Sequence, residues 1–232
     1  MIAKILRSFE IIPGEKILEI GPGEGALTHE LLKMDCKLTS LELDTALAQK
    51  WQDIANDYTG FDCIEADATK IDWSPFLPVD KLVGNIPYNV SRSLIYKAFK
   101  HREGISKLIF MVQKEFADKL VAKPGDDAYG ILSVLSQTFS NARLLFTIPP
   151  SVFYPPPKVM SACVELVFLD IDIDDETFIS IVKTAFNQRR KTLRNSLKNY
   201  FSPELEDVFD WGKRADQLSP ELFVELVDLL SN

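Results

Sequence analysis

The feature that most constrains the fold of this sequence is a repeated succession of an apolar run, a turn and an amphipathic segment. Short apolar runs predict buried strands, and apolar residues that recur at helical spacing between them predict helices. The strands predicted in this way span residues 16–20, 37–43, 62–65, 82–85 and 107–112. Strands that alternate with helices at this pitch predict an α/β fold built on a Rossmann-like, doubly wound parallel sheet.

The turn after the first predicted strand contains Gly21, Gly23 and Gly25. Glycine lets a ligand approach the backbone closely, and the first free amides of the next helix would meet negative or polar groups. Gly21, Gly23 and Ala26 also satisfy the glycine pattern of dinucleotide sites, with an acid about twenty residues further on. The turn alone therefore leaves an NAD site and a purely structural turn open.

Two acids follow the next two strands. Glu42 ends the second strand, where it can accept hydrogen bonds from the two hydroxyls of a ribose. Asp67, next to Ala68, ends the third strand, where it can accept from the exocyclic amine of an adenine. Ligands of open α/β sheets bind at this edge. The second acid, Asp67, together with residues 85–88, weighs against NAD, because hydride transfer requires neither of them.

The segment Asn85, Ile86, Pro87 and Tyr88 lies between the fourth strand and the amphipathic residues 91–99. Pro87 has no backbone N–H and a fixed φ, so it biases Ile86 toward an extended geometry and frees nearby carbonyls from the sheet. The tetrapeptide thus offers an amide side chain, a spare carbonyl and an aromatic ring. These groups suit a planar heterocycle that carries an amino group.

The charge of the chain is unevenly distributed. The net charge is −8, but residues 91–168 hold 10 Lys and Arg against 6 Asp and Glu, a net +4. A cluster of basic residues near the C-terminus comprises Arg189, Arg190, Lys191 and Arg194. Such a cluster is either a solvated surface or a phosphate-binding site.

Cysteine and histidine usage bounds the compartment and the chemistry. The chain has three widely spaced cysteines and two isolated histidines, which predicts neither a disulfide framework nor a metal site. The N-terminal ten residues are amphipathic and lack an export signal, and no apolar run is long enough for a membrane helix. These features predict a cytoplasmic protein.

A charged break over residues 170–176 predicts a boundary between a domain of residues 1–169 and a small all-helical domain of residues 170–232. The predicted helices of the second domain, with Ser and Pro at two of their starts, span residues 178–186, 192–200, 203–209 and 220–230.

Seven motifs in register resemble those of the S-adenosylmethionine-dependent ribosomal RNA adenine N6,N6-dimethyltransferases. They span residues 17–28, 41–44, 65–68, 84–91, 112–119, 153–161 and 185–197, and residues 214–218 close the match. This resemblance covers the chain nearly end to end. It implies a methyltransferase domain over residues 1–169 and an RNA-binding domain over residues 170–232. The cofactor-binding residues that follow are Gly21, Gly23, Glu42, Asp67, Ala68 and Asn85.

The resemblance also implies the reaction, which is transfer of methyl groups to N6 of two adjacent adenosines near the 3′ end of small-subunit ribosomal RNA during ribosome biogenesis. The Asn85 side chain and the Ile86 carbonyl would each accept one N–H of the target amine. Tyr88 and Phe153 would stack on the two faces of the flipped base, at roughly 1 to 3 kcal/mol for each stacked base. The predicted catalytic residues are Asn85, Ile86, Pro87, Tyr88 and Phe153.

The partner that the resemblance implies is small-subunit ribosomal RNA or its precursor particle, bound by a monomer that needs neither metal nor membrane. Arg189, Arg190, Lys191 and Arg194 would contact phosphates. Three rival functions remain: a large-subunit RNA adenine methyltransferase that confers macrolide resistance, a non-catalytic RNA-binding assembly factor, and an NAD oxidoreductase.

The sequence departs from the family at two places. The sequence begins near the helix that should follow an N-terminal segment of the family, which covers the cofactor and the target; whether the start is truncated or the segment was lost, we expect weaker cofactor binding and reduced activity of these 232 residues. Met160 stands where an Asp is common.

Overall fold

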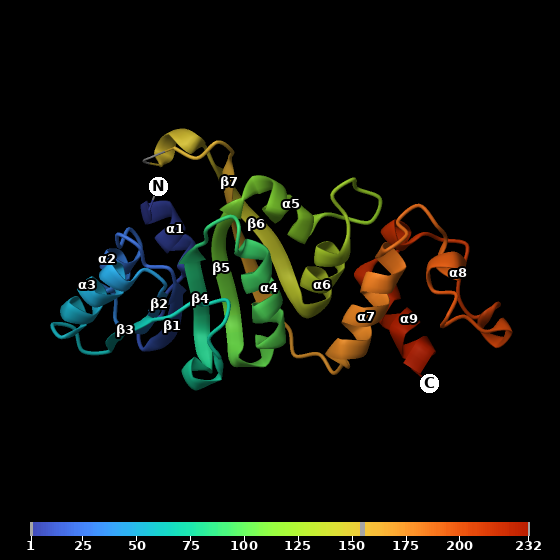
Figure 1. Ribbon diagram of the computed structural model, residues 1–232, viewed down its shortest axis with the longest axis horizontal. Coiled ribbons are helices and arrows are strands. Elements are labelled where there is room, and N and C mark those ends of the chain that lie inside the picture. Colours follow the sequence, from blue (N-terminus) through green and yellow to red (C-terminus); the bar gives the residue numbers. More distant parts are fainter. Residues whose placement is uncertain (1, 154–155, 232) are drawn as a thin grey trace. The chain divides into compact units, whose positions relative to one another are not determined.

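The computed structural model describes residues 2–153 and 156–231, so Tyr154 and Pro155 of the proline-rich loop lie outside the described residues. A seven-stranded sheet has the order β3-β2-β1-β4-β5-β7-β6 (Figure 1). Its strands are β1 (Glu15–Ile20), β2 (Cys36–Glu42), β3 (Phe61–Glu65), β4 (Val79–Asn85), β5 (Ile105–Gln113), β6 (Ser140–Ile148) and β7 (Ser161–Phe168). The α-helices are α1 (Ile2–Phe9), α2 (Thr28–Leu31), α3 (Thr45–Ala55), α4 (Ser91–Lys100), α5 (Lys114–Val121), α6 (Ile131–Phe139), α7 (Asp175–Phe186), α8 (Leu193–Ser196) and α9 (Pro220–Ser231).

Strands β1 to β5 are parallel, which confirms the predicted Rossmann-like α/β sheet. Strand β7 pairs with β5 in the antiparallel direction, so the sheet is mixed beyond the five strands that the sequence predicted as parallel. Two adjacent strands that follow one another in the chain can run parallel only if a long crossover, usually a helix, connects them. The chain between β6 and β7 contains only one short 3₁₀ turn, Pro150–Val152, among its described residues.

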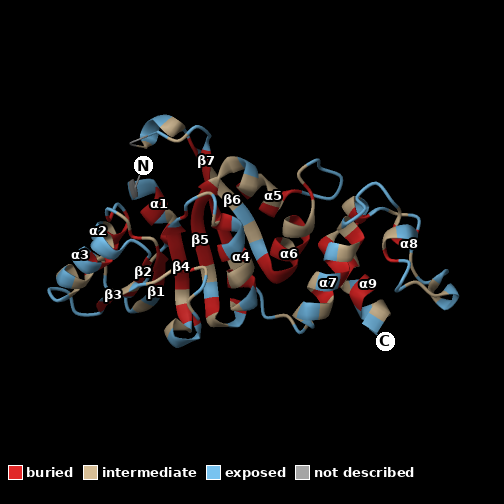
Figure 2. Cartoon of the chain, in the orientation of Figure 1, coloured by how far each residue is buried: buried red, intermediate tan, exposed pale blue. Residues whose placement is uncertain are grey.

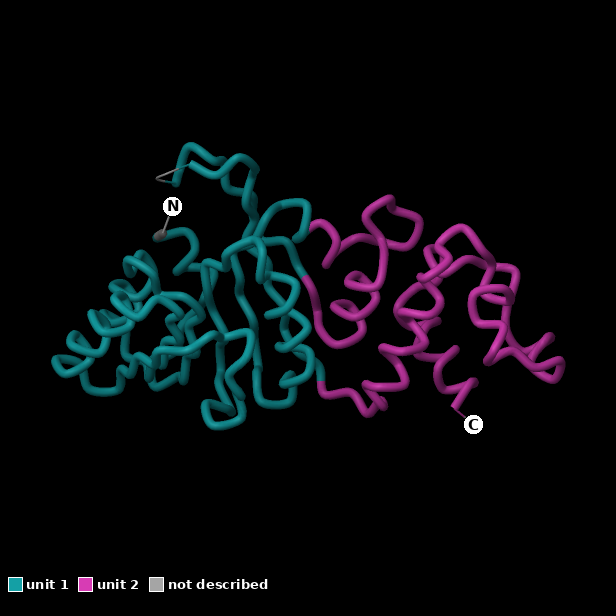
Figure 3. The backbone as a smooth tube through the Cα atoms, in the orientation of Figure 1, with its two compact units in different colours: residues 1–117, 143–169 teal, residues 118–142, 170–232 magenta. Residues whose placement is uncertain are grey.

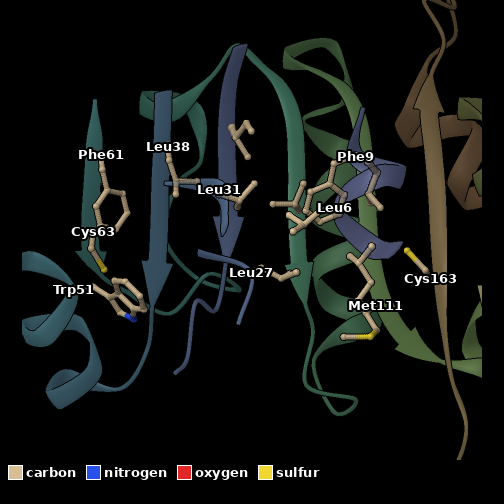
Figure 4. Packing of buried hydrophobic residues seen from close by; sticks show 14 of the residues in the cluster. Leu6, Phe9, Leu27, Leu31, Leu38, Trp51, Phe61, Cys63, Met111 and Cys163 are labelled. Atoms are coloured by element: carbon tan, nitrogen blue, oxygen red, sulfur yellow. The ribbon is translucent and has the colours of Figure 1, made fainter. Parts of the chain in front are cut away.

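A cluster of buried hydrophobic residues lies between one face of the sheet and the helices α1 and α3 (Figures 2 and 4). Trp51 from α3 packs edge-on against Phe61 of β3, and Phe9 from α1 is buried against the middle strands. These strands are rich in apolar residues because both of their faces are covered. Their buried side chains fix the register and therefore the edge at which the polar strand ends emerge.

Contacts divide the chain into two compact units (Figure 3). Unit 1 comprises residues 1–117 and 143–169, and unit 2 comprises residues 118–142 and 170–232. Residues 118–142 thus group with the C-terminal helices, because α6 packs against α7 and α9. The functional division at residue 169 stays a prediction.

Two of the four predicted C-terminal helices form as expected. α7 begins after Asp174, whose carboxylate caps the helix, and α9 begins at Pro220. The predicted helix 192–200 is only α8, and residues 203–209 contain a 3₁₀ turn rather than an α-helix. Trp211 offers a different packing site, because Phe209 of this segment and Phe201 just before it both pack on the Trp211 ring.

Candidate functional site

The glycine turn after β1 adopts a conformation that favours glycine. The φ angles are +68° at Gly21, +53° at Gly23 and +89° at Gly25, a region that L-residues with side chains rarely enter. The amides of these three residues all donate within the protein at 2.9 Å, to the Leu41 carbonyl, the Glu42 carboxylate and the Pro22 carbonyl respectively. The three glycine amides therefore already have partners within the protein, and the expectation that the first free amides of the next helix meet negative or polar groups stays a prediction.

Trp51 supports this turn from α3. Its indole Nε1 donates to the Gly23 carbonyl at 2.8 Å. A Cβ on Gly25 would lie 2.4 Å from the Trp51 ring, so a larger residue does not fit there. Both ends of the Gly23 residue, its amide and its carbonyl, are thus held by neighbouring side chains.

Glu42 ends β2 beside the turn, and it is buried. One carboxylate oxygen accepts from the Gly23 amide and the other from the Asp44 amide, each at 2.9 Å. These bonds fix the direction of the carboxylate while each oxygen keeps a further lone pair. Leu43, the next residue, is 68% exposed, which leaves a large apolar side chain beside the acid.

Asp67 lies in the loop after β3. Its Oδ1 accepts from the Thr69 amide at 2.9 Å and from the Thr69 hydroxyl at 2.6 Å, and its Oδ2 is 3.0 Å from Lys70 Nζ. The Thr69 hydroxyl, together with Lys70, lowers the pKa of Asp67 to about 2. Asp67 is therefore a carboxylate over the physiological range and a constant hydrogen-bond acceptor.

The Asn85–Tyr88 segment follows β4 at the same edge of the sheet. The Asn85 side chain is exposed and makes no hydrogen bond to any described residue. Ile86 is buried, and its amide donates to the Met111 carbonyl at 3.0 Å. The Tyr88 hydroxyl lies 2.7 Å from the Ser161 hydroxyl at the start of β7.

A cavity of about 780 Å³ brings several of these groups together. Of the predicted site residues, those that line it are Gly21, Gly23, Glu42, Asn85, Pro87 and Phe153. Phe153 also packs on the core cluster, and its stacking on a flipped base stays a prediction. Asp67, Ala68, Ile86 and Tyr88 lie outside the cavity lining.

Glu19 lines the same cavity but is not among the predicted site residues. It is 1% exposed and accepts from the Thr28 hydroxyl and, at 2.8 Å, from the Ser40 hydroxyl. Burial raises the pKa of Glu19 to about 7, against the effect of the two hydroxyls and with a smaller contribution from Glu42. An acid inside an apolar run of β1 was the only sign of it in the sequence.

The basic cluster lies in unit 2, and its four members differ. Arg190 and Lys191 are exposed. Arg189 donates to the Asp127 carbonyl at 2.8 Å, and Arg194 forms an ion pair with Glu206 and lies 4.8 Å from the centroid of the Phe201 ring.

Met160, which is also exposed, has no explanation in the structure beyond its backbone bond to Lys114.

The described residues contain neither a membrane-spanning helix nor a metal-binding group of side chains. No helix within residues 2–153 and 156–231 is long and apolar enough to cross a membrane. Within the same residues, no group of three or more His, Cys, Asp or Glu side chains is placed to hold a metal ion.

Comparison with known proteins gives a consistent family. The family model described as ribosomal RNA adenine dimethylase matches residues 1–232. Ribosomal RNA small subunit methyltransferase A of Syntrophotalea carbinolica is 41% identical over 97% of this chain and 90% of that relative. The protein of the same name from Parabacteroides distasonis is 41% identical over 97% of this chain and 85% of that relative.

Solved structures agree with this. A dimethyladenosine transferase from Plasmodium falciparum has a TM-score of 0.88 and 26% identity, over 99% of this chain and 94% of that one. The 23S rRNA methyltransferase ErmE has a TM-score of 0.75 at 24% identity, over 100% of this chain and 97% of that one, which is a likeness of fold alone.

Proposed function

The chain belongs to the ribosomal RNA adenine dimethylase family, and from this premise we propose that it transfers methyl groups from S-adenosylmethionine to N6 of two adjacent adenosines near the 3′ end of small-subunit ribosomal RNA. The observation that carries the proposal is the single cavity shared by Gly21, Glu42, Asn85 and Phe153, because it joins a ribose-binding acid to an amide acceptor and an aromatic ring. The product is N6,N6-dimethyladenosine, made during ribosome biogenesis.

The donor groups of the cavity fit an adenosyl cofactor. Glu42 would hold the ribose hydroxyls with its remaining lone pairs, Asp67 beside Ala68 would accept from the adenine amine, and Gly21 and Gly23 would admit the methionine part. The cofactor, when bound, supplies an activated methyl group. A dinucleotide fits less well, because the pyrophosphate of such a ligand needs free backbone amides and the Gly23 amide is taken by Glu42.

The Asn85–Tyr88 segment prepares the target nitrogen. The N6 lone pair of adenine is delocalised into the ring, so two acceptors for its N–H groups, the Asn85 side chain and the Ile86 carbonyl, draw electron density back onto nitrogen. Holding the reactants in line can contribute on the order of 7 to 11 kcal/mol. No strong base is required, since methylated nitrogen is acidic and its proton can leave to solvent.

The base must leave its stack to reach this site, at a cost of about a few kcal/mol. Phe153 in the cavity wall and Tyr88 would stack on the base, and Pro87 would fix the turn between Asn85 and Tyr88. After the first transfer only one N–H remains, so the amine has to turn before the second transfer.

Unit 2 would hold the RNA substrate, or its precursor particle, through phosphate contacts. The exposed Arg190 and Lys191 are the foremost candidates, with Arg189 and Arg194 beside them. We place the reaction in the cytoplasm and assign it to a monomer; the free thiols of Cys36, Cys63 and Cys163 support a reducing compartment.

Nucleoside mass spectrometry of ribosomal RNA tests the proposal. Small-subunit RNA from cells that lack the gene should lose N6,N6-dimethyladenosine and regain it when the full protein is returned. Loss from large-subunit RNA instead would favour the macrolide-resistance type of enzyme, and no change in either RNA would favour a non-catalytic assembly factor. The 41% identity to small subunit methyltransferases supports the first outcome.

A further inference from the structure

Helix α4 begins just after the Asn85–Tyr88 segment and sends one side chain to the loop that follows β3. The Lys97 Nζ donates to the Ala68 carbonyl at 3.1 Å and also to the Ile71 carbonyl. The same ammonium group lies 5.1 Å from the centroid of the Trp73 ring. Lys97 therefore connects the helix of the target-binding segment to the loop of Asp67.

The Ala68 carbonyl receives a second donor, the Trp73 indole Nε1, at 3.0 Å. Two donors on one carbonyl oxygen fix the plane of the peptide group between Ala68 and Thr69, because a peptide group is planar. The N–H of that same peptide group belongs to Thr69 and donates to Asp67 Oδ1 at 2.9 Å. The oxygen of the peptide is thus held by Lys97 and Trp73, while its N–H orients the Asp67 carboxylate.

The electrostatics of the loop agree with this geometry. Burial lowers the pKa of Lys97, while the nearby Asp72 and Asp67 favour its charged form. A charged donor makes stronger hydrogen bonds to a carbonyl than a neutral donor does. Lys100, on the same helix, is exposed and has none of these contacts among the described residues.

We propose that Lys97 is a positioning residue for the cofactor's adenine: through the Ala68–Thr69 peptide it sets the direction of the Asp67 carboxylate, and so the preference for a base with an exocyclic amine. The inference rests on the proposed function, in which Asp67 accepts from that amine.

The test compares two product analogues, S-adenosylhomocysteine and S-inosylhomocysteine, by calorimetry on the full chain. They differ in the amine that Asp67 would accept from, which is an oxygen in the inosyl compound. The variants are Lys97→Met, which removes the ammonium and keeps an apolar stem, Lys97→Arg, which keeps a cation with donors, and Lys100→Met as the matched control. Asp67→Asn provides the reference for lost discrimination.

In the wild-type protein S-adenosylhomocysteine should bind more tightly than its inosyl analogue. Lys97→Met should weaken binding of S-adenosylhomocysteine about tenfold, the worth of a hydrogen bond to a charged group, with little change for the inosyl compound. Lys97→Arg should stay within about threefold of the wild type, since it remains a charged donor, and Lys100→Met should match the wild type.

The inference is overturned if Lys97→Met keeps the wild-type preference between the two analogues, or loses affinity for both by the same factor, as a merely structural residue would. If Lys97→Met does not fold, Lys97→Gln should show the same loss of preference for S-adenosylhomocysteine over S-inosylhomocysteine. Failure of the proposed function looks different: the wild-type protein would then bind neither analogue.

Discussion

The glycine turn and the Asn85–Tyr88 segment lie at the same edge of one sheet, yet they treat their polar groups in opposite ways. The turn has its three glycine amides and the Gly23 carbonyl bonded within the protein. The Asn85 side chain is exposed and has no partner among the described residues. Under the proposed function, the cofactor side would thus be built in advance, whereas the target side would keep its acceptors for the substrate.

The largest expected effect comes from removing the open acceptor. Asn85→Ala should lower the rate of methyl transfer by roughly a hundredfold or more, the usual range for one preorganised polar group at a reacting centre. Binding of S-adenosylhomocysteine should change far less. Single-turnover transfer from radiolabelled cofactor measures the rate, with Asn141→Ala, an exposed asparagine elsewhere, as the control. Activity above a tenth of the wild-type value would end the proposed role of Asn85.

The same contrast exists within the basic cluster of unit 2, where Arg190 and Lys191 are open and Arg194 is paired with Glu206. Reversing both open charges, Arg190→Glu with Lys191→Glu, should weaken RNA binding strongly. The plot of log affinity against log salt should become shallower by about 2, because each phosphate contact contributes roughly 0.9.

Arg194→Gln is the matched variant for this comparison. This substitution should change the salt dependence of RNA binding less than the loss of either open charge does, because the Arg194 guanidinium already pairs with Glu206. Filter binding of a small-subunit RNA fragment over a salt series gives both quantities. An unchanged slope in the double variant would make the cluster an ordinary solvated surface.

A smaller effect is expected on the closed side. Glu42→Gln replaces one carboxylate oxygen by an NH₂ group that faces a backbone N–H, from either Gly23 or Asp44. Loss of one charged hydrogen bond, about 1.5 to 3 kcal/mol, should raise the Kd of S-adenosylhomocysteine about tenfold and lower the melting temperature. Calorimetry and thermal unfolding measure the two changes. Wild-type affinity would contradict a ribose-binding role for Glu42.

The last prediction concerns the pH dependence of stability that Glu19, in β1 just before the turn, should produce. Its pKa is about 7 in the folded protein, above the unfolded value near 4.5, so the folded state binds the proton more tightly. The free energy of unfolding should therefore fall as pH rises from about 4.5 to about 7, by at most about 3 kcal/mol from this group. Urea unfolding of the wild type and of Glu19→Gln at several pH values isolates the contribution of Glu19 to the free energy of unfolding, because the glutamine side chain does not titrate. Parallel curves would contradict the shift.

The sequence predicted the polar strand ends because each of them interrupts an apolar run. Glu42 and Asn85 end their strands where expected, and both line the cavity. Glu19 is not predicted in this way because it lies inside an apolar run and not at its end. Its partner Ser40 is opposite it in the register between β1 and β2, which only the folded sheet reveals.

Non-local packing explains the other differences. Residues 118–142 group with the C-terminal helices through the contacts of α6 with α7 and α9, and no local pattern carries that information. The segment 203–209 has helical spacing of apolar residues, but Phe209 packs on the Trp211 ring instead of on a helix face. Tertiary contacts override local propensity at such positions.

The placement of the tryptophans has a practical consequence. Trp51 is bonded to the glycine turn and Trp73 to the Ala68 carbonyl, whereas Trp211 belongs to unit 2. All three are at most 2% exposed. The chain therefore carries intrinsic fluorophores on the two supports of the proposed cofactor site and a third in the other unit. With single Trp→Phe replacements, their emission separates an event at the turn from one at the Asp67 loop without any attached dye.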